Sequence, residues 1–509
     1  MNFAMLLDMA ADAFGERSAV TCRDSSLTYA GLRGAARAAA AQLRAGAFAH
    51  AALLDTNGLA APVALFAAAY AGVPYVPLNY RLTAHELAEL LRRVAPALLV
   101  AQPAYVAPLQ IPAQVEWVDG QCLLSPPQSE EGVPLELPAE PGAIAIQLFT
   151  SGTTAAPKAA VLRHENLMSY ILGTVEFGAA APEEAALVAV PPYHIAGISA
   201  VLSSTYSGRR IVMLPAFEPA EWVRLLVQEH ITHAFVVPTM LVRILEYLAQ
   251  QAPAARFPAL RAIAYGGGRM PLTVIERALE VFGGVDFTNA YGLTETSATI
   301  CLLTPEDHRA AAASEDPQTR RRLASVGRPL PTVELQVRDA AGQVLGHERP
   351  GLIFVRGAQV AGEYRGSGSV LDAEGWFPTQ DRGWTDSDGY VFLEGRADDV
   401  IVRGGENISP GEVEEALLAH PAVADAVVVA VPSEQWGEAV GAAVVLRAGS
   451  SVTAEELRQW VRARLRSSRV PERLVFRSEL PYNEMGKVLR RLVRRDLEDA
   501  GSGPTSPMR

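Results

Sequence analysis

Up to about residue 300, short apolar runs alternate with stretches of helical periodicity. One helical stretch begins at a capping-box pattern, Thr83 with Glu86, ahead of apolar residues three or four positions apart. Apolar runs between such helices are typical of strands in parallel sheets covered by helices. The runs are AIAIQLFT (143–150), AALVAV (185–190), RRIVML (209–214), HAFVVP (233–238) and LRAIAYGG (260–267). The pattern predicts an α/β fold with mostly parallel sheets.

The pattern changes after residue 303. Residues 304–325 are polar and lack apolar periodicity, which predicts a solvated connection. From about residue 325, strand-like runs joined by Gly-containing turns predict a small, β-rich, barrel-like subdomain. Ser409 followed by Pro410 marks a helix start in a last α+β unit.

These boundaries give three parts. We expect an N-terminal domain over 1–396, made of two α/β subdomains and the β-rich one. A small, mobile α+β domain over 397–499 follows, and the ending AGSGPTSPMR predicts a disordered tail over 500–509.

Composition excludes several classes of protein. The 509 residues are 49% hydrophobic, enough for large cores, and the net charge of −12 argues against a nucleic-acid partner or an anionic membrane surface. Three widely spaced cysteines fit a reducing cytoplasm, and the N-terminus lacks the basic lead of a secretory signal. Proline and glycine interrupt the uncharged run 58–78, which predicts a buried helix and strand rather than a membrane span. The oligomeric state, including a homodimer, stays open.

The segment 149–161, FTSGTTAAPKAAV, has the composition of a phosphate-binding loop. Small residues let backbone N–H groups approach a phosphate, hydroxyls add donors, and a lysine adds positive charge. The residues concerned are Thr150, Ser151, Gly152, Thr153, Thr154 and Lys158. No glycine precedes Lys158, so this is not the G-x-x-x-x-G-K-[ST] loop, and on these residues alone a polar turn is an equal alternative.

Four further motifs follow in order: NAYGLTE (289–295), Asp381, GRADD (395–399) and NEMGK (483–487). Together with the loop, they resemble the acyl-adenylate-forming superfamily, which includes acyl-CoA synthetases, peptide-synthetase adenylation domains and beetle luciferases. The resemblance spans nearly the whole chain. It favours the phosphate-loop interpretation and implies ATP, Mg²⁺ and coenzyme A as substrates or cofactors.

The resemblance implies a role for each matched residue. Tyr291 stacks on adenine, Thr294 meets phosphate, Glu295 holds Mg²⁺, Asp381 accepts both ribose hydroxyls and Arg396 lies near ribose and phosphate. Remaining matched nucleotide positions are Gly267, Asn289, Ala290 and Gly292. A strand end for Tyr291 and Gly292, a solvated turn for Asp381 and a surface cation for Arg396 are the alternatives.

Within the matched motifs, the sequence departs from the family pattern at three positions. The family usually has glycine where Ala155 and Ala159 stand, and also just before Asp381. Alanine costs little at ordinary backbone angles but is strained at positive φ. Slower adenylation is the expected consequence of such strain.

Two half-reactions are implied, with different arrangements of the small domain. Lys487 reaches the α-phosphate and substrate carboxylate during adenylation, where preorganised positive charge stabilises the transition state. The small domain then rotates about Asp398 and brings the loop containing Gly404 and Gly405 to a pantetheine tunnel. An exposed lysine and a plain hairpin are the alternatives.

The acceptor and the acid depend on other segments. Trp436 resembles the tryptophan that borders pantetheine in CoA ligases, although small-domain core is the alternative, and Arg81 matches a residue at the CoA 3′-phosphate. Arg473 is a further candidate, but Glu472 puts an acid where such ligases are often basic.

The segment PPYHIAG (191–197) lacks the aspartate with which amino-acid-activating relatives pair the substrate ammonium, so an α-amino acid is not expected. We predict a roomy pocket for a bulky or aromatic hydrophobic acid, with His194 on the acyl or pantetheine path. The pocket residues are Tyr193, His194, Ala196, Gly197, Gly266 and Gly268. Close backbone approach near adenine is the other reason for glycine at these positions.

The leading hypothesis is an AMP-forming carboxylate–CoA ligase. One alternative passes the acyl-adenylate to the phosphopantetheine of an acyl-carrier protein, and Trp436 with Arg81 argues against it. A non-catalytic nucleotide binder is the third hypothesis, disfavoured because Lys487, Glu295 and Asp381 are all present.

Overall fold

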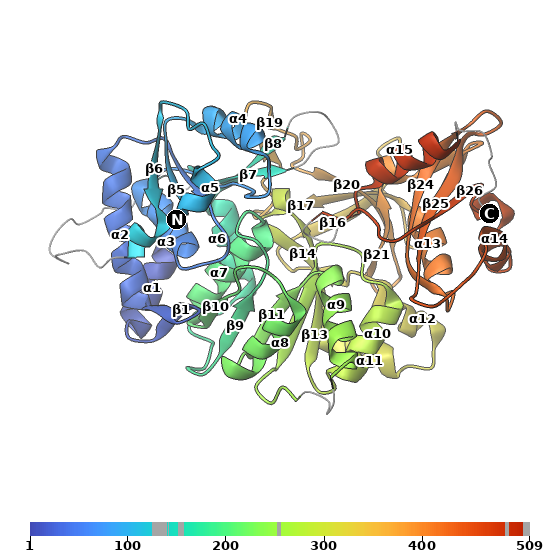
Figure 1. The fold of residues 1–509 in the computed structure, drawn as a ribbon, viewed down its shortest axis with the longest axis horizontal. Helices are drawn as coiled ribbons and strands as arrows, with labels where there is room; N and C mark the ends of the chain where they lie inside the picture. The colour runs from blue at the N-terminus through green and yellow to red at the C-terminus, as the bar shows by residue number, and fades with distance from the viewer. Residues whose placement is uncertain (125–139, 141, 151–156, 252–255, 484–487, 502–509) are drawn as a thin grey trace.

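Four β-sheets organise the chain (Figure 1). This computed structural model describes residues 1–124, 140, 142–150, 157–251, 256–483 and 488–501. Every apolar run predicted above as a strand is one, and the capping box at Thr83 begins α4 (Ala84–Val94).

A nine-stranded sheet carries most of the predicted parallel strands. The pairs from β13 through β12, β11, β9 and β10 to β1 are parallel, whereas β14, β15 and β2 pair antiparallel at the two ends. Its strands in spatial order are β15 (Arg328–Pro329), β14 (Ala298–Leu303), β13 (Asp286–Leu293), β12 (Ala262–Gly266), β11 (His233–Val236), β9 (Ala185–Val188), β10 (Arg210–Met213), β1 (Ser18–Cys22) and β2 (Ser25–Thr28). The helices connecting its strands include α7 (Ile195–Ser207), α8 (Pro219–Gln228), α9 (Pro238–Ala249) and α10 (Leu272–Val281).

An eight-stranded sheet carries the candidate phosphate loop. Its strands in spatial order are β19 (Gly368–Ser369), β18 (Glu363–Tyr364), β8 (Lys158–Arg163), β7 (Ile144–Thr150), β4 (Tyr75–Pro77), β3 (His50–Leu54), β5 (Ala97–Ala101) and β6 (Val115–Asp119). The helices of this part are α1 (Ala4–Phe14), α2 (Tyr29–Ala45), α3 (Ala60–Ala71), α4, α5 (Pro103–Val106) and α6 (His164–Thr174), with the 3-10 turn η1 (Gly120–Leu124). One apolar core joins α1, α2 and α3 to strands of both large sheets. The uncharged run 58–78 is α3 followed by β4, as predicted.

The prediction of a solvated connection over 304–325 is wrong. The segment forms α11 (Pro305–Ala313), α12 (Pro317–Arg320) and the 3-10 turn η3 (Arg321–Ala324), with a capping box at Thr304. His308 and Leu323 are 1% and 2% exposed, and the buried His308 Nε2 lies 2.9 Å from the Tyr265 hydroxyl. So few apolar positions anchor these helices that periodicity could not reveal them.

The β-rich subdomain is a four-stranded antiparallel sheet: β16 (Glu334–Arg338), β17 (Gly351–Arg356), β20 (Phe377–Thr385) and β21 (Val391–Arg396). Within the described ranges its order has two ends, at β16 and β21, so the strands do not close into a barrel.

The 3-10 turn η4 (Ala397–Asp399) leads into a five-stranded sheet with its own core. Its strands are β22 (Ile401–Arg403), β23 (Glu406–Ile408), β24 (Val423–Ser433), β25 (Gly437–Leu446) and β26 (Arg473–Arg477). Its helices are α13 (Pro410–Leu418), α14 (Ala454–Arg462) and α15 (Arg490–Gly501), with the 3-10 turn η5 (Ser467–Arg469). Residues 500 and 501 of the predicted tail belong to α15, a correction, and 502–509 lie outside the described residues. The α/β fold class with a small α+β C-terminal unit is confirmed.

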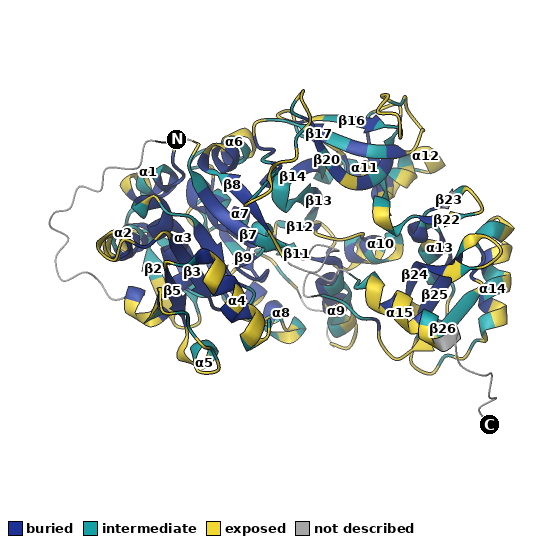
Figure 2. Cartoon of the chain, turned by 90° about the horizontal axis from the view of Figure 1, so that it is seen from above, coloured by how far each residue is buried: buried dark blue, intermediate teal, exposed yellow. Residues whose placement is uncertain are grey.

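The sheets are largely buried, and several of the helices that cover them are exposed on their outer faces (Figure 2). Figure 2 shows buried strands inside the sheets and exposed outer faces on helices such as α4, α8 and α15. Among the described residues, no helix combines the length and apolar character needed to cross a membrane.

Candidate active site

The turn between β13 and β14 places two predicted site residues at the carboxyl end of a parallel strand, the usual place for ligand sites in such sheets. Thr294 and Glu295 lie in the 3-10 turn η2 (Thr294–Thr296), after which β14 returns antiparallel. Gly292 is required there because a Cβ would lie 1.7 Å from the Ala298 carbonyl oxygen. Close strand approach therefore explains this glycine.

Tyr291, Asp381 and Arg396 meet although they are far apart in the sequence. The Tyr291 hydroxyl donates to Asp381 Oδ2 at 2.6 Å, and Arg396 Nη1 donates to Asp381 Oδ1 at 3.2 Å. The pairing of β20 with β21 sets Asp381 opposite Arg396. Burial, followed by the charge of Asp381, raises the pKa of Tyr291, so its hydroxyl stays a neutral donor.

Glu295 and Lys158 both contact one tyrosine that was not among the predicted residues. The Tyr364 hydroxyl donates to Glu295 Oε1 at 2.6 Å, and Lys158 Nζ lies 5.5 Å from the centre of the Tyr364 ring. Tyr364 is 69 positions from Glu295 and belongs to none of the motifs, so only strand pairing could reveal it.

The departures from the family pattern have different structural consequences. Ala159 is buried in β8 opposite Phe149, in extended backbone, so its methyl group causes no backbone strain. Gln380, in contrast, has a φ of 63°, a left-handed conformation that glycine adopts more easily. Ala155 lies outside the described residues.

Part of the predicted phosphate loop and the lysine predicted to be catalytic also lie outside the described residues. These residues are Ser151, Gly152, Thr153, Thr154 and Lys487. Thr150, at the end of β7, donates its hydroxyl to the Lys158 carbonyl oxygen at 3.4 Å, which ties the two ends of the loop together.

In the segment predicted to line the acyl pocket, an aromatic pair precedes α7. The Tyr193 and His194 rings lie 4.6 Å apart, and Tyr193 packs edge-to-face on Tyr80. Burial lowers the pKa of His194 to about 4, so its imidazole is neutral at pH 7. Its buried Nε2 and the buried Tyr193 hydroxyl have no hydrogen-bond partner among the described residues.

The predicted pocket glycines differ in their surroundings. A Cβ on Gly266 would lie 2.2 Å from the Ala290 carbonyl oxygen, and one on Gly197 would lie 3.1 Å from that of Pro191. Gly267 has a φ of 79°. Only Gly268 leaves room, since its nearest neighbour would be the Pro238 ring at 3.6 Å. Ala196, in the first turn of α7, is half-buried.

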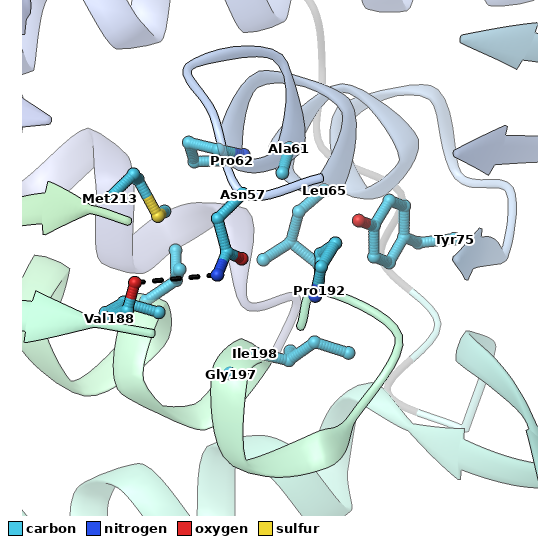
Figure 3. A pocket seen from close by; sticks show the side chains of 11 residues that line it. Asn57, Ala61, Pro62, Leu65, Tyr75, Val188, Pro192, Gly197, Ile198 and Met213 are labelled. Atoms are coloured by element: carbon cyan, nitrogen blue, oxygen red, sulfur yellow. Dashed lines mark hydrogen bonds between the residues drawn. The ribbon is translucent and has the colours of Figure 1, made fainter. Parts of the chain in front are cut away.

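Gly197 also borders a small apolar cavity between the two large sheets, shown in Figure 3. Its volume of about 20 Å³ is enough for one water molecule and too small for an aryl acid. Beside it, the Asn57 amide donates to the carbonyl oxygens of Val190 at 2.9 Å and Leu214 at 3.1 Å. The Asn57 side chain therefore links the segment after β3 to the segments after β9 and β10.

Trp436 lies at a glycine turn of the small unit. Gly404 has a φ of 57° and its backbone N–H donates to the Trp436 carbonyl oxygen at 2.9 Å, while Arg403 stacks on the indole at 5.0 Å. Trp436 is 40% exposed, so it is not small-domain core. Gly405 has a φ of 85° with open space around it.

The other predicted small-domain and CoA residues have different surroundings. Arg473 Nη1 donates to the Leu497 carbonyl oxygen at 3.2 Å. Asp398 is exposed in η4, and Arg81 lies beside the Tyr80 ring in the N-terminal part. An ion pair links the two parts: Arg269 Nη2, just after Gly268, lies 2.6 Å from Glu415 Oε1 on α13.

Comparison with known proteins places this geometry in a family. The model described as AMP-binding enzyme matches residues 7–365, and the model of its C-terminal domain matches 412–487. The chain belongs to the AMP-binding enzyme family. The predicted resemblance is thereby confirmed.

Relatives of this AMP-binding enzyme are similar over nearly their whole length. A feruloyl-CoA synthase of Amycolatopsis sp. is 33% identical over 94% of this chain and 95% of its own. A fatty acid–[acyl-carrier-protein] ligase of Streptomyces coeruleorubidus is 32% identical over 94% of this chain and 92% of its own. The o-succinylbenzoate CoA synthetase of Bacillus subtilis, solved with its acyl-adenylate intermediate, has a TM-score of 0.81 and 28% identity, covering 100% and 99% of the two chains. The predicted class of enzyme, an AMP-forming acid–thiol ligase, is confirmed.

Proposed function

We propose that this AMP-binding enzyme is an aryl carboxylate–CoA ligase. The acid carboxylate attacks the α-phosphorus of ATP and displaces pyrophosphate, and the CoA thiol then attacks the acyl carbon and displaces AMP. The main support for an aryl acid as substrate is that the residues proposed to line the acyl pocket include aromatic ones and are uncharged. His194 is neutral at pH 7, and the segment 191–197 has no carboxylate that could pair with a substrate ammonium group. The feruloyl and o-succinylbenzoate enzymes among the relatives support the same class.

The proposed binding site for the adenosine part of ATP contains Tyr291, Asp381 and Arg396. Asp381 accepts the ribose hydroxyls while its two partners hold it in place, and the Tyr291 ring lies beside adenine. The backbone of Gly267, Asn289, Ala290 and Gly292 lines the adenine. Thr150, Lys158 and Thr294 contact the phosphates, together with the loop residues outside the described part.

Magnesium fits the oxygen donors beside this nucleotide. Mg²⁺ commonly binds through one or two carboxylates, completed by phosphate oxygens and water. Glu295 supplies one carboxylate, with the Thr294 hydroxyl next to it, and Oε1 of Glu295 is already held by Tyr364. Glu295 would hold the ion, whose charge would offset that of the phosphates.

The two half-reactions use different faces of the small domain. Lys487 stabilises the charge of the adenylation transition state, and rotation about Asp398 then brings Gly404, Gly405 and Trp436 to the thiol path. Lys487→Ala should abolish acyl-AMP formation and leave attack of CoA on supplied acyl-AMP within a few-fold, measured as separate half-reactions. Equal loss of both would refute this division.

Free CoA is the proposed acceptor rather than a carrier protein. Trp436 is exposed beside a glycine turn, where it can border the pantetheine arm of either acceptor, and only CoA brings a 3′-phosphate that needs a basic contact. Arg81 is the proposed contact of the CoA 3′-phosphate. Arg473 is the weaker candidate, because the acidic Glu472 directly precedes it.

The test is pyrophosphate release with Mg-ATP over fatty, aryl, polycyclic and amino acids, with and without CoA. The proposal expects release with aryl acids, stimulated by CoA, and an acyl-CoA product. Release that is indifferent to CoA but stimulated by a pantetheinylated carrier would identify the second candidate, and preference for fatty acids would refute the acid class.

The space at Gly268 gives a test of the acyl pocket. Gly268→Ala fits the backbone and Gly268→Leu fills the space beside Pro238, so the leucine variant should lose activity on bulky acids far more than on small ones. Equal losses on both would remove Gly268 from the pocket.

A further inference from the structure

One short segment holds Glu295 at two points. The backbone N–H groups of Ala361 and Gly362 donate to the Glu295 carbonyl oxygen at 2.9 and 3.1 Å, and the Tyr364 hydroxyl donates to its carboxylate at 2.6 Å. The peptide and the side chain of Glu295 are thus both fixed by residues about 65–70 positions further along the chain.

Tyr364 is itself fixed by strand pairing. β18 pairs with β8, setting Tyr364 opposite Ala160, and the Arg365 N–H donates to the Ala159 carbonyl oxygen at 2.8 Å. The neighbouring Glu363 accepts two 2.9 Å hydrogen bonds from Arg163. These contacts do not involve the phenol hydroxyl, so β18 keeps its place when that hydroxyl is removed.

The hydroxyl uses one carboxylate oxygen only. Oε1 of Glu295 accepts from Tyr364, and Oε2 has no hydrogen-bond partner among the described residues. A hydrogen bond to Oε1 alone favours one orientation of the carboxylate, in which Oε2 is left for a cation. The Lys158 ammonium lies over the face of the same ring, 5.5 Å from its centre, so Tyr364 contacts two charged groups that belong to the proposed nucleotide site.

We propose that Tyr364 is a positioning residue for Mg-ATP, which holds Glu295 through its hydroxyl and Lys158 through its ring. The inference rests on the proposed role of Glu295 at the metal. Partners of metal ligands typically contribute about 10–100-fold to metal affinity, because they fix the ligand before the ion arrives.

Tyr364→Phe separates the two contacts, since it keeps the ring and removes the hydroxyl. Binding of a non-hydrolysable ATP analogue is measured by calorimetry with and without Mg²⁺. We expect metal-free affinity within about 2-fold of wild type and a roughly 10-fold smaller gain on adding Mg²⁺. The half-saturating Mg²⁺ concentration for pyrophosphate release should rise by a similar factor, and the KM for the acid should not change.

A matched control removes the same kind of bond elsewhere. The Tyr390 hydroxyl donates to Asp307 Oδ1 at 2.5 Å, on α11 rather than on η2, so Tyr390→Phe should leave the Mg²⁺ dependence unchanged. In a Glu295→Gln background, Tyr364→Phe should have almost no further effect, because the group it positions is no longer a carboxylate.

Two outcomes would overturn the inference: an unchanged Mg²⁺ dependence, or an equal loss of metal-free and Mg²⁺-bound affinity. The binding measurement needs no acid or CoA. An enzyme that binds Mg-nucleotide in this way but activates no acid therefore contradicts the proposed function and leaves Tyr364 in its role.

Discussion

Asp381→Asn tests the ribose site most directly, because the structure fixes how many contacts its carboxylate has left. A carboxylate has about four acceptor positions on its two oxygens. Tyr291 uses one position on Oδ2 and Arg396 uses one on Oδ1. Two positions remain, one for each ribose hydroxyl.

The amide cannot reproduce this arrangement. Its oxygen must face Arg396, because an NH₂ group there would oppose a guanidinium donor, and its NH₂ group then faces Tyr291. At most one neutral acceptor position is left for two hydroxyls. Hydrogen bonds to a charged group contribute about 1.5–3 kcal/mol each, so we expect a loss of about 2–4 kcal/mol, or roughly 30–1,000-fold in AMP affinity.

The assay is calorimetric binding of AMP and of its 2′,3′-dideoxy analogue to wild type and variant. The variant should lose affinity for AMP and little for the dideoxy analogue, so that discrimination between them nearly disappears. Asp307→Asn is the matched control, because Asp307 also accepts from a tyrosine, Tyr390, and lies 3.7 Å from Arg328. Equal losses for both nucleotides would refute the ribose role and leave Asp381 as a support for Tyr291.

Three other predictions follow from particular contacts. Gln380→Gly should raise the thermal midpoint by about 1 °C, since a left-handed φ of 63° costs a non-glycine residue about 1 kcal/mol and the shift is small in so large a domain, and a lower midpoint would contradict the backbone argument. Burial lowers the pKa of both His164 and His194 to about 4, whereas an unfolded chain protonates them near pH 6.5. The unfolded state therefore binds more protons below about pH 6.5, and the urea midpoint should fall from that pH toward about pH 4, less steeply in His194→Gln; an identical slope in the variant would refute the assignment. Arg269→Glu or Glu415→Arg should each change the ratio of the two half-reaction rates by about 2–5-fold, because an exposed ion pair contributes up to about 1 kcal/mol, and the double reversal should restore the ratio unless the pair plays no part in domain arrangement.

Elements with a strong local pattern could be predicted from the sequence. The apolar runs of the two large sheets and the cap at Thr83 depend on neighbouring residues only, and all appear in the structure. For the segment 304–325 the prediction was wrong, because its local pattern is weak. Its helices are anchored by a buried histidine and a few small or isolated apolar side chains, a pattern too weak to show periodicity.

The motifs predicted which residues form the candidate site, but not which of these residues contact one another. Tyr291 and Asp381, 90 positions apart, meet only because β20 and the end of β13 come together in the fold. The same holds for glycine: Gly266 and Gly292 are explained by backbone approach, whereas Gly268 leaves real space, and a sequence of glycines cannot distinguish these cases.

The sequence by itself therefore determined the alternation of strands and helices, the family and the residue types at the nucleotide, because periodicity and motifs are local properties. Only the tertiary structure decided that Tyr364 holds Glu295, that Arg269 pairs with Glu415 and that His194 is neutral. Hydrogen bonds, ion pairs and desolvation depend on which distant segments are packed together, and strand pairing and burial set that packing.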